Sequence, residues 1–567
     1  MQIVMDLLLM LGGVAVFLFG MQQMGLGLEQ SAGASVNKLF KTIDKNRLVN
    51  YSVGVGATAI VQSSSATSVM TIGLANAKII NLKQGTGIML GCSVGTTITA
   101  FIISLSGVSM GGFNMSILFA STAFVGVLIS IFSNKDTLKK FSVFLVGFGM
   151  LFVGLQVMVY SIGGADSVLS AELTKLFRFD FMKNPFWLVI MGILIACVIH
   201  SSSAASGVFI TFLMTGIIDT IDQSFFLIIG ANIGTCIDGL IASIGSSANG
   251  KRLALFHVLN STMGACAFSI ILVIFREPIV GFFDGLFPVE RQWSLATFNV
   301  MYNATYTLIL LFFLDPMVSL ITTMVKEKAD TVLQTHYIDD RLLTTPAVAV
   351  DNAFREVCDM AEMARANLDL AFDAVLNSNV SSSKSIADTE YQIDYITRSL
   401  ASYFIKLSTK PMSKKDRRLI GGLHHVINDI ERIGDHAVLL VKEAYYGTEH
   451  SITFLDETKS ELSEIYAKIT EMHNLSLDTF KGRKIYNLEK IHAMHKEIFE
   501  MISTTGDIHI ERLNSGLYSV EVSKSIYSIF NSLQRVPDHI VNIAFSILSD
   551  TGSKTEAFSS LRSNSRG

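Results

Sequence analysis

The first 325 residues consist of long apolar stretches separated by short polar segments. Seven stretches are long enough to cross a bilayer, or nearly so. They cover about 4–28, 85–107, 114–133, 138–162, 225–247, 253–276 and 292–316. Met1–Asp6 holds no basic residue, so we expect a retained first span rather than a cleaved signal peptide. The pattern predicts an all-α, polytopic membrane domain over 1–325.

Two further apolar segments, about 50–75 and 186–218, are interrupted by runs of serine. The runs are Gln62-Ser63-Ser64-Ser65-Ala66-Thr67 and His200-Ser201-Ser202-Ser203-Ala204-Ala205. Each is followed by a glycine-framed turn, Gly91-Cys92-Ser93-Val94-Gly95-Thr96-Thr97 or Gly230-Ala231-Asn232-Ile233-Gly234-Thr235-Cys236. Polar groups cost free energy in lipid unless they are paired or line a cavity. We therefore expect both segments to be re-entrant hairpins that return to the side from which they enter.

The two motifs and their turns recur at an offset near 138 residues, which indicates an internal repeat. One copy covers about 4–133 and the other about 138–276, followed by an extra span at 292–316. Each copy contains three crossings, an odd number, so the two copies should be inverted relative to each other. Inverted repeats with broken helices at matching places predict a substrate site at the repeat interface, near the middle of the membrane.

Basic residues give this topology an orientation. With the N-terminus outside, the predicted inner loops hold Lys38, Lys41, Lys45, Arg47, Lys135, Lys139, Lys140, Lys251, Arg252, Lys326 and Lys328. The predicted outer loops, 163–185 and 277–291, mix both signs of charge. This distribution follows the positive-inside rule. It predicts a protein of the cell (inner) membrane whose C-terminal part lies in the cytoplasm.

Composition changes sharply after the last span. Residues 1–325 carry 30 charged side chains, whereas the shorter stretch 326–567 carries 62. We predict a linker over 326–346, a soluble helical domain over 347–550 and a disordered tail over 551–567. Two apolar stripes at helical spacing predict bundle helices. They consist of Leu419, Leu423, Val426, Ile430, Ile433, Ala437 and Leu440, and of Ile386, Ile393, Leu400, Phe404 and Leu407.

Charge and cysteine content exclude several classes of function. A net charge of −4 gives no indication of a nucleic-acid partner. The five cysteines are odd in number and form no C-x-x-C pair, which argues against a disulfide framework or a zinc site. No nucleophile–base constellation or nucleotide motif indicates an enzyme.

The polar groups of the serine motifs suit small ions. Hydroxyl and carbonyl oxygens favour a hard cation such as sodium, while free helix N-termini favour an anion. Asp238 lies inside a span, where it could bind a cation or balance charge, or could form a helix–helix hydrogen bond. His200 could satisfy a local hydrogen bond or take part in proton coupling. The serine runs could instead serve close helix packing. Polar positions within 254–260 and 296–303 could act in interhelical hydrogen bonds or in support of the site.

The paired Q-S-S-S and G-x-N-x-G-T-T patterns resemble those of the sodium/phosphate cotransporter family, the type II class and its bacterial relatives. The resemblance covers roughly 1–325 and implies sodium-driven phosphate transport. It implies a sodium and phosphate site formed by Gln62, Ser63, Ser64, Ser65, Ser93, Thr96, Thr97, His200, Ser201, Ser202, Ser203, Asn232 and Thr235, to which we add Asp238. Three residues depart from the family pattern: His200 stands for glutamine, Ser93 for asparagine and Cys236 for threonine. These departures leave the ion stoichiometry open.

The soluble part also contains a repeated motif. Glu431-Arg432-Ile433-Gly434-Asp435-His436 returns as Gln534-Arg535-Val536-Pro537-Asp538-His539. The helical periodicity of this part predicts two three-helix bundles, at about 347–447 and 452–549. The repeated signature resembles that of the PhoU family of phosphate-regulatory proteins. The resemblance implies a divalent or iron-type metal, with Glu431, Asp435 and Asp538 as ligand candidates. Glu390 and Asp394 could complete such a site, and the alternative is a salt-bridged face.

These observations favour a sodium-coupled phosphate transporter that works by alternating access under the control of a cytoplasmic PhoU-like domain. A membrane-anchored phosphate sensor without net transport and a phosphate exporter remain as alternatives. The expected partners are inorganic phosphate, sodium ions, the lipid bilayer and a second copy of the chain in a homodimer.

Overall fold

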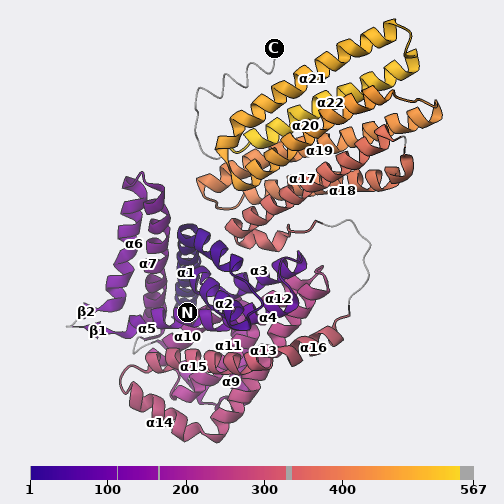
Figure 1. Ribbon diagram of the computed structural model, residues 1–567. Helices are drawn as coiled ribbons and strands as arrows, with labels where there is room; N and C mark the ends of the chain where they lie inside the picture. The colour runs from indigo at the N-terminus through magenta and orange to yellow at the C-terminus, as the bar shows by residue number, and fades with distance from the viewer. Residues whose placement is uncertain (1, 111–112, 164–166, 327–334, 378, 549–567) are drawn as a thin grey trace. The chain divides into compact units, whose positions relative to one another are not determined.

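The chain forms two compact units (Figure 1). The computed structural model describes residues 2–110, 113–163, 167–326, 335–377 and 379–548, and the predicted tail at 551–567 lies outside them. The first unit, here the membrane unit, comprises Met1–Asp330 and Asp339–Val348; the second, the helical unit, comprises Thr331–Ile338 and Ala349–Gly567. Apart from β1 (Ser109–Met110) and its antiparallel partner β2 (Phe113–Asn114), the regular structure of the described residues is helical. The all-α class is therefore confirmed.

The membrane unit contains sixteen α-helices among its described residues. They are α1 (Gln2–Lys41), α2 (Arg47–Val61), α3 (Ser64–Asn76), α4 (Leu82–Gly95), α5 (Thr97–Ser104), α6 (Met115–Phe132), α7 (Asp136–Gly163), α8 (Val168–Arg178), α9 (Pro185–Ile199), α10 (Ser202–Met214), α11 (Ile221–Gly234), α12 (Cys236–Ser243), α13 (Ala248–Ile274), α14 (Arg276–Leu286), α15 (Arg291–Phe312) and α16 (Leu314–Met324). Short 3-10 turns occur at Leu105–Gly107, Asp180–Lys183 and Asp340–Thr344.

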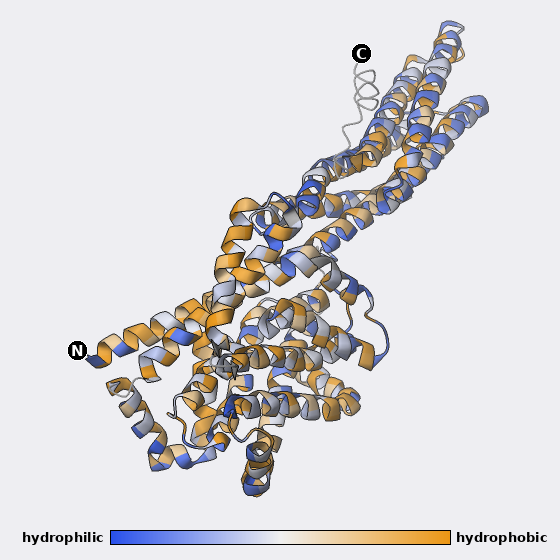
Figure 2. Cartoon of the chain, turned by 90° about the vertical axis from the view of Figure 1, so that its left-hand side faces the viewer, coloured by the Kyte–Doolittle hydropathy of each residue, from blue (hydrophilic) through white to orange (hydrophobic). Residues whose placement is uncertain are grey.

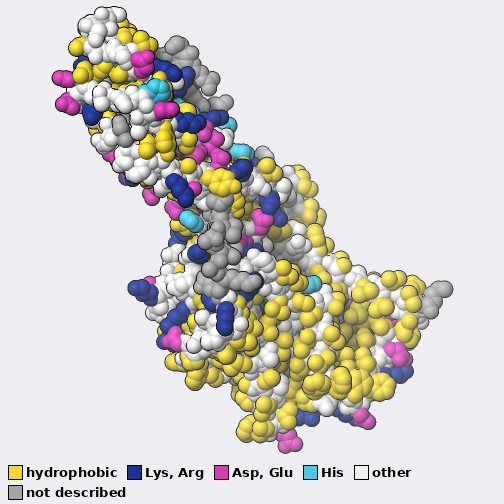
Figure 3. Space-filling model, turned by 90° about the vertical axis from the view of Figure 1, so that its right-hand side faces the viewer, with side chains coloured by type: hydrophobic (Ala, Val, Ile, Leu, Met, Phe, Trp, Pro, Cys, Tyr) yellow, Lys and Arg dark blue, Asp and Glu magenta, His cyan; other side chains and the backbone are white. Residues whose placement is uncertain are grey.

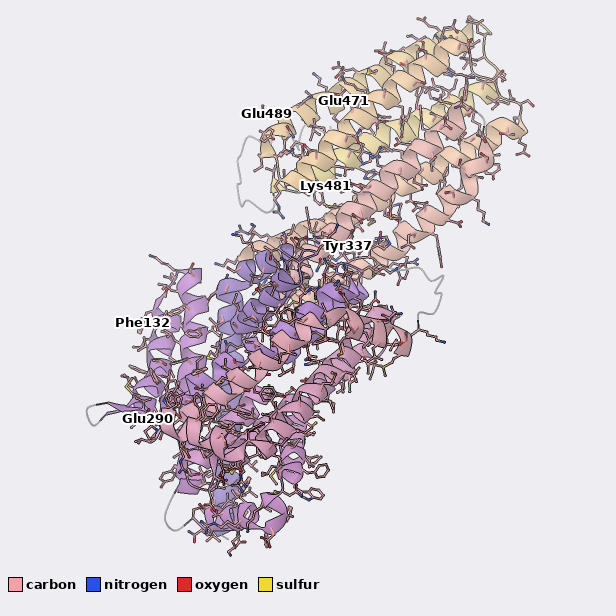
Figure 4. The ribbon with its side chains drawn as sticks, turned by 60° about the horizontal axis from the view of Figure 1, so that its bottom comes forward. Phe132, Glu290, Tyr337, Glu471, Lys481 and Glu489 are labelled. Carbon is pink, nitrogen blue, oxygen red and sulfur yellow. The ribbon has the colours of Figure 1, made fainter. Side chains whose placement is uncertain are left out.

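Seven described helical segments are long and apolar enough to cross a membrane, and each overlaps one of the seven predicted spans. Figure 2 shows the hydrophobic residues concentrated along these helices. Large apolar side chains also cover the outside of the unit, as the space-filling view shows (Figure 3). Phe132, at the end of α6 (Figure 4), is 78% exposed. Such a surface is suited to lipid, and the chain is a multi-pass membrane protein.

The predicted outer loops are partly helical, which is a correction to the sequence analysis. Residues 163–185 contain α8, whose first turn is capped by Ser167: the Ser167 hydroxyl accepts a hydrogen bond from the Ser170 amide at 3.2 Å. Residues 277–291 contain most of α14, which buries Phe283. Each of these helices buries one apolar side of a short amphipathic segment that is too short to appear as a span.

Helices α1 and α7 pack against each other in antiparallel register. Gly20 of α1 lies against Leu151 of α7, and Gly154 of α7 lies against Phe17 of α1. Residues 17 and 20 correspond to 151 and 154 at an offset of 134, so the two contacts are equivalent to each other. Small residues at such contacts let membrane helices approach closely. An antiparallel pair of equivalent helices is what inverted repeats would produce; the inversion and the re-entrant hairpins stay predictions.

The helical unit consists of six long helices. They are α17 (Pro346–Leu376), α18 (Ser383–Ser408), α19 (Lys414–Glu449), α20 (Asp456–Gly482), α21 (Leu488–Asn514) and α22 (Val520–Phe545), with 3-10 turns at Val380–Ser382 and Ile485–Asn487. Both predicted apolar stripes face the interior: their members are buried except Leu419, which is half-buried. Lys481, near the end of α20 (Figure 4), forms an ion pair with Glu362 of α17.

Candidate functional site

Each serine motif forms the same break between two helices. Helix α2 ends before Gln62 and α9 ends before His200, and both residues adopt the left-handed backbone conformation, with φ of 58° and 56°. The next residue caps the following helix: the Ser63 hydroxyl accepts a hydrogen bond from the Ala66 amide and the Ser201 hydroxyl from the Ala204 amide. A left-handed non-glycine residue costs about 1–3 kcal/mol and is common at functional sites.

The break residue of each motif is tied to the helix that follows the turn. In the first repeat, the Thr99 hydroxyl donates to Gln62 Oε1 at 2.7 Å. In the second repeat, His200 Nδ1 lies 2.6 Å from Asp238 Oδ1. The two contacts occupy matching positions, but an ionisable pair replaces a neutral one. The departure of His200 from the family pattern is thus matched by an acid at its partner position.

Asp238 also connects the two repeats. Its second oxygen, Oδ2, accepts a hydrogen bond from the Ser65 hydroxyl at 2.5 Å. Ser65 belongs to the first serine motif and Asp238 to α12 of the second repeat, 173 positions later. The Asp238 side chain is 15% exposed and that of His200 is 53% exposed. One carboxylate therefore contacts both serine motifs, while a substrate site at this place stays a prediction.

The other predicted site residues lie in first turns or at kinks. Ser64 begins α3, and Ser202 and Ser203 begin α10, where both are buried. At the turns, the Thr96 hydroxyl donates to the Ser93 carbonyl and the Thr235 hydroxyl to the Asn232 carbonyl, while Thr97 donates to Val94. These hydroxyls are satisfied by their own helix in this conformation. To bind an ion through hydrogen-bond donation, they would have to rotate away.

Glycines allow the helix before each serine motif to pack closely against the helix that leads to the following turn. Gly54 of α2 faces the Ile88 carbonyl of α4, and Gly192 of α9 faces the Leu227 carbonyl of α11. The two contacts differ by 138 and 139 positions, the offset of the serine motifs. The two packing contacts therefore recur at the offset of the sequence motifs, one for each serine motif.

The acidic residues predicted as metal ligands lie in two separate groups. Glu431 and Asp435 lie on α19 near Glu390 of α18, whose two carboxylate oxygens are buried without a hydrogen-bond partner. Burial and the neighbouring acids Asp435, Asp394 and Glu431 raise the pKa of Glu390 to about 8. Asp538 instead pairs with His495 at 2.8 Å.

No group of three or more His, Cys, Asp or Glu side chains in the described chain has the arrangement of a metal site. The composition of the Glu390 group nevertheless suits a cation, because crowded carboxylates repel one another and oxygen ligands favour hard cations. Metal binding by Glu431 and Asp435 stays a prediction. The same holds for Asp538, which lies in a different set of contacts.

Glu390→Gln tests whether this acidic group carries an energetic cost. The folded-state pKa of Glu390 lies above its ordinary value of 4.5, so ionisation of Glu390 destabilises the folded state. This loss of stability begins as pH rises from 4.5 and is complete above about 8. At pH 8.5 with a metal chelator present, the free energy of opening that hydrogen exchange reports for the α18 amides should be about 2 kcal/mol higher in the variant than in the wild-type chain. This figure is reduced for partial solvent screening. At pH 5 the gain should shrink.

Hydrogen exchange of the α18 amides also tests whether this acidic group binds a metal. Added Mn²⁺ should protect the α18 amides of the wild-type chain and have a smaller effect on Glu390→Gln. Equal protection of both chains, or none of either, would contradict a metal at this group.

Sequence reasoning did not include Thr99, Tyr302 or Tyr306 among the site residues. Thr99 bonds the break residue of the first motif, and its position is the equivalent of Asp238. The two tyrosines are buried in α15, which lies outside the repeats. The run of polar residues at 296–303 was a sequence signal for Tyr302, whereas Thr99 and Tyr306 lie outside that run.

Comparisons with known proteins agree with this architecture. The family model described as Na+/Pi-cotransporter matches residues 16–160 and 164–283, and the PhoU domain model matches 357–444. YjbB of Escherichia coli (strain K12), named for inorganic phosphate export, is 21% identical over 553 residues, 96% of this chain and 98% of that protein. YqeW of Bacillus subtilis (strain 168), an uncharacterized protein, is 27% identical over 303 residues, 53% of this chain and 91% of its own length.

Among solved structures, PhoU from Streptococcus pneumoniae aligns with 37% of this chain and 98% of its own, at a TM-score of 0.34 and 16% identity. PhoU from Pseudomonas aeruginosa aligns with 36% of this chain and 99% of its own, at a TM-score of 0.35 and 18% identity. The resemblance stated from the sequence is confirmed by the family models: residues 16–160 and 164–283 match the Na+/Pi-cotransporter model, and residues 357–444 match the PhoU domain model.

Proposed function

We propose that this protein moves inorganic phosphate across the cell membrane by alternating access, coupled to sodium ions, under the control of its cytoplasmic PhoU-like domain. The observation that carries the proposal is the Ser65–Asp238–His200 contact, in which one carboxylate joins the serine motifs of both repeats. Alternating access requires two halves that separate on one side while they close on the other. When ions and phosphate bind at a site formed by both halves, they change the contacts of both halves at once.

Phosphate and sodium would have complementary tasks at this interface. The first turns of α3 and α10 present helix N-termini and serine hydroxyls, which suit an oxyanion. Asp238 and the neutral oxygens around it suit sodium ions, which would offset the charge of the phosphate. Each net positive charge carried inward gains about 2.3 kcal/mol per 100 mV of membrane potential. Sodium therefore supplies both electrostatic balance and driving force.

The segment Asp339–Val348 gives regulation a physical route. The Arg341 side chain donates to the carbonyls of Ala242 at 2.5 Å and Ile244 at 3.0 Å, at the end of α12. Asp339 accepts a hydrogen bond from Asn76 at the end of α3. Helix α3 begins in the first serine motif and α12 carries Asp238, so this segment holds both elements of the site. This segment is continuous in sequence with α17, so a displacement of α17 would be transmitted to both α3 and α12.

Radiolabelled phosphate flux into proteoliposomes that hold the purified full-length chain tests the proposal. An inward sodium gradient should drive accumulation that a potassium gradient does not. Ser64→Ala and Ser202→Ala should each reduce the initial rate at least about tenfold, a loss of about 1.4 kcal/mol. Ser121→Ala is the matched control, because Ser121 is exposed on α6 and bonds only to its own helix.

Export is the second candidate, because a relative that aligns over 96% of this chain is named for phosphate export. Vesicles preloaded with phosphate distinguish the directions when protease has removed the PhoU-like domain from one orientation only. Export would be established if phosphate moves only from the side that carries the PhoU-like domain to the opposite side. The absence of phosphate movement toward the PhoU-like side under an inward sodium gradient would contradict sodium-driven uptake. Sodium-dependent phosphate binding without flux in either direction would contradict transport and favour the sensor.

A further inference from the structure

A group of buried polar side chains on α13 and α15 lacks hydrogen-bond partners. Asn260 and Tyr302 are fully buried and Tyr306 is 4% exposed. Neither phenol oxygen is partnered, nor is either polar atom of the Asn260 side chain. An unsatisfied buried polar group is unfavourable, and native proteins almost always satisfy such groups with protein, water or an ion. Three in one place indicate a bound species.

These groups converge on the two glycine-framed turns. Tyr302 and Tyr306 lie one helical turn apart on α15, with ring centroids 5.0 Å apart. The Tyr306 phenol lies near Ser93 and Asn260, and the Tyr302 phenol lies near Asn232, without forming a hydrogen bond to any of them. The Asn232 amide nitrogen is itself buried and unpartnered. Ser93 and Asn232 are equivalent positions 139 apart, so α15 places one tyrosine against the matching residue of each repeat.

The chemistry of the group favours a monovalent cation. Its unpartnered atoms include neutral phenol and carboxamide oxygens, which are suitable ligands for sodium. Divalent cations prefer carboxylates, and none of the five side chains is acidic. In the helices that line the group, α4, α11, α13 and α15, lysine and arginine occur only within the first five residues. Asp238, which acts electrostatically on neighbouring Cys236 and His257, adds negative charge nearby.

We propose that Asn260, Tyr302 and Tyr306, together with Ser93 and Asn232, form a sodium-binding site to which α13 and α15 contribute. The proposal rests on the transport function and deepens it, because it assigns one coupling ion to residues outside the serine motifs. It also assigns a role to α15, which lies outside both predicted repeats, because α15 would contribute ligands beside both turns. The site is distinct from the Ser65–Asp238–His200 contact.

Binding of radioactive ²²Na⁺ to the detergent-purified full-length chain tests the proposal without phosphate or flux. We expect Tyr306→Phe and Asn260→Leu each to weaken sodium affinity at least tenfold, since each removes an oxygen and keeps most of the packing. Tyr51→Phe is the matched control: the Tyr51 hydroxyl lies near Tyr306 but is bonded to Thr307 at 3.0 Å. Its affinity for sodium should stay within twofold of wild type.

Sodium affinity unchanged within twofold in both variants would overturn the proposal and leave water as the occupant. A wild-type chain that binds no ²²Na⁺ would overturn it as well. Folding defects are distinguished by flux: excess sodium should restore phosphate transport to Tyr306→Phe with an unchanged KM for phosphate, whereas a misfolded chain would not recover.

The two proposals fail separately. Sodium-driven flux in the wild type, with normal ²²Na⁺ binding in both variants, contradicts this site and leaves the transport function intact. Loss of ²²Na⁺ binding in the variants, with no flux in the wild type, supports the site and contradicts transport.

Discussion

Asp238→Asn is expected to reduce phosphate flux between about tenfold and 100-fold while the chain remains folded. The Asp238 carboxylate accepts from the Ser65 hydroxyl and pairs with His200, so it holds the two serine motifs together. Hydrogen bonds to a charged group contribute about 1.5–3 kcal/mol each. Asparagine keeps the size of the side chain but removes the charge and one acceptor oxygen. The initial rate of labelled phosphate flux in proteoliposomes measures the effect.

Asp219→Asn is the control for this change, because Asp219 forms an exposed ion pair with Arg178 away from the motifs. Its flux should stay within about twofold of wild type, as exposed pairs contribute less than about 1 kcal/mol. Ser65→Ala combined with Asp238→Asn adds a second comparison. If the contact acts as a unit, the double variant should lose little more than Asp238→Asn alone. Strictly additive losses, or wild-type flux in Asp238→Asn, would show that the contact has no part in transport.

The sequence was sufficient to predict the elements whose physical signal is local. A membrane span needs about 20 apolar residues in succession, and all seven predicted spans have a matching apolar helix. The helix breaks were also predictable, since a serine run within apolar sequence favours capping over continued helix. The apolar stripe of α19 gave its buried face directly, because helical spacing places Leu423, Val426 and Ile430 on one side.

Contacts between distant segments were not predictable in the same way. The Ser65–Asp238 contact joins positions 173 apart, and no spacing rule connects them. Asp238 was singled out as an intramembrane acid, but its partners depend on how the two repeats meet. Tyr302 and Tyr306 resemble ordinary aromatic residues of an apolar helix until their hydroxyls are seen to lack partners. The helices α8 and α14 were missed because short amphipathic segments are weak signals beside long spans.

Two of the departures from the family pattern can be related to the side chains that lie beside them. His200 in place of glutamine and Ser93 in place of asparagine lie in different repeats, yet each faces a group that matches it. His200 meets Asp238, where the first repeat pairs Gln62 with Thr99. Ser93 is shorter than its equivalent Asn232, and Tyr306 approaches it from α15. These two of the three departures therefore each have a neighbouring group, Asp238 or Tyr306, that should be tested together with the changed residue.

Gly54→Val is expected to lower the apparent melting temperature of the detergent-solubilised chain by more than about 5 °C, and Gly192→Val should act alike. A Cβ at either position would lie well within 3.0 Å of a backbone carbonyl, Ile88 in α4 or Leu227 in α11. Backbone cannot move aside as a flexible side chain does, so the two helices would separate at a cost of more than about 3 kcal/mol. Gly12→Val is the control, because nothing lies within 4 Å of a Cβ there. Equal melting temperatures for Gly54→Val and Gly12→Val would contradict the close packing of α2 against α4. A loss in only one of Gly54→Val and Gly192→Val would contradict the equivalence of the two repeats.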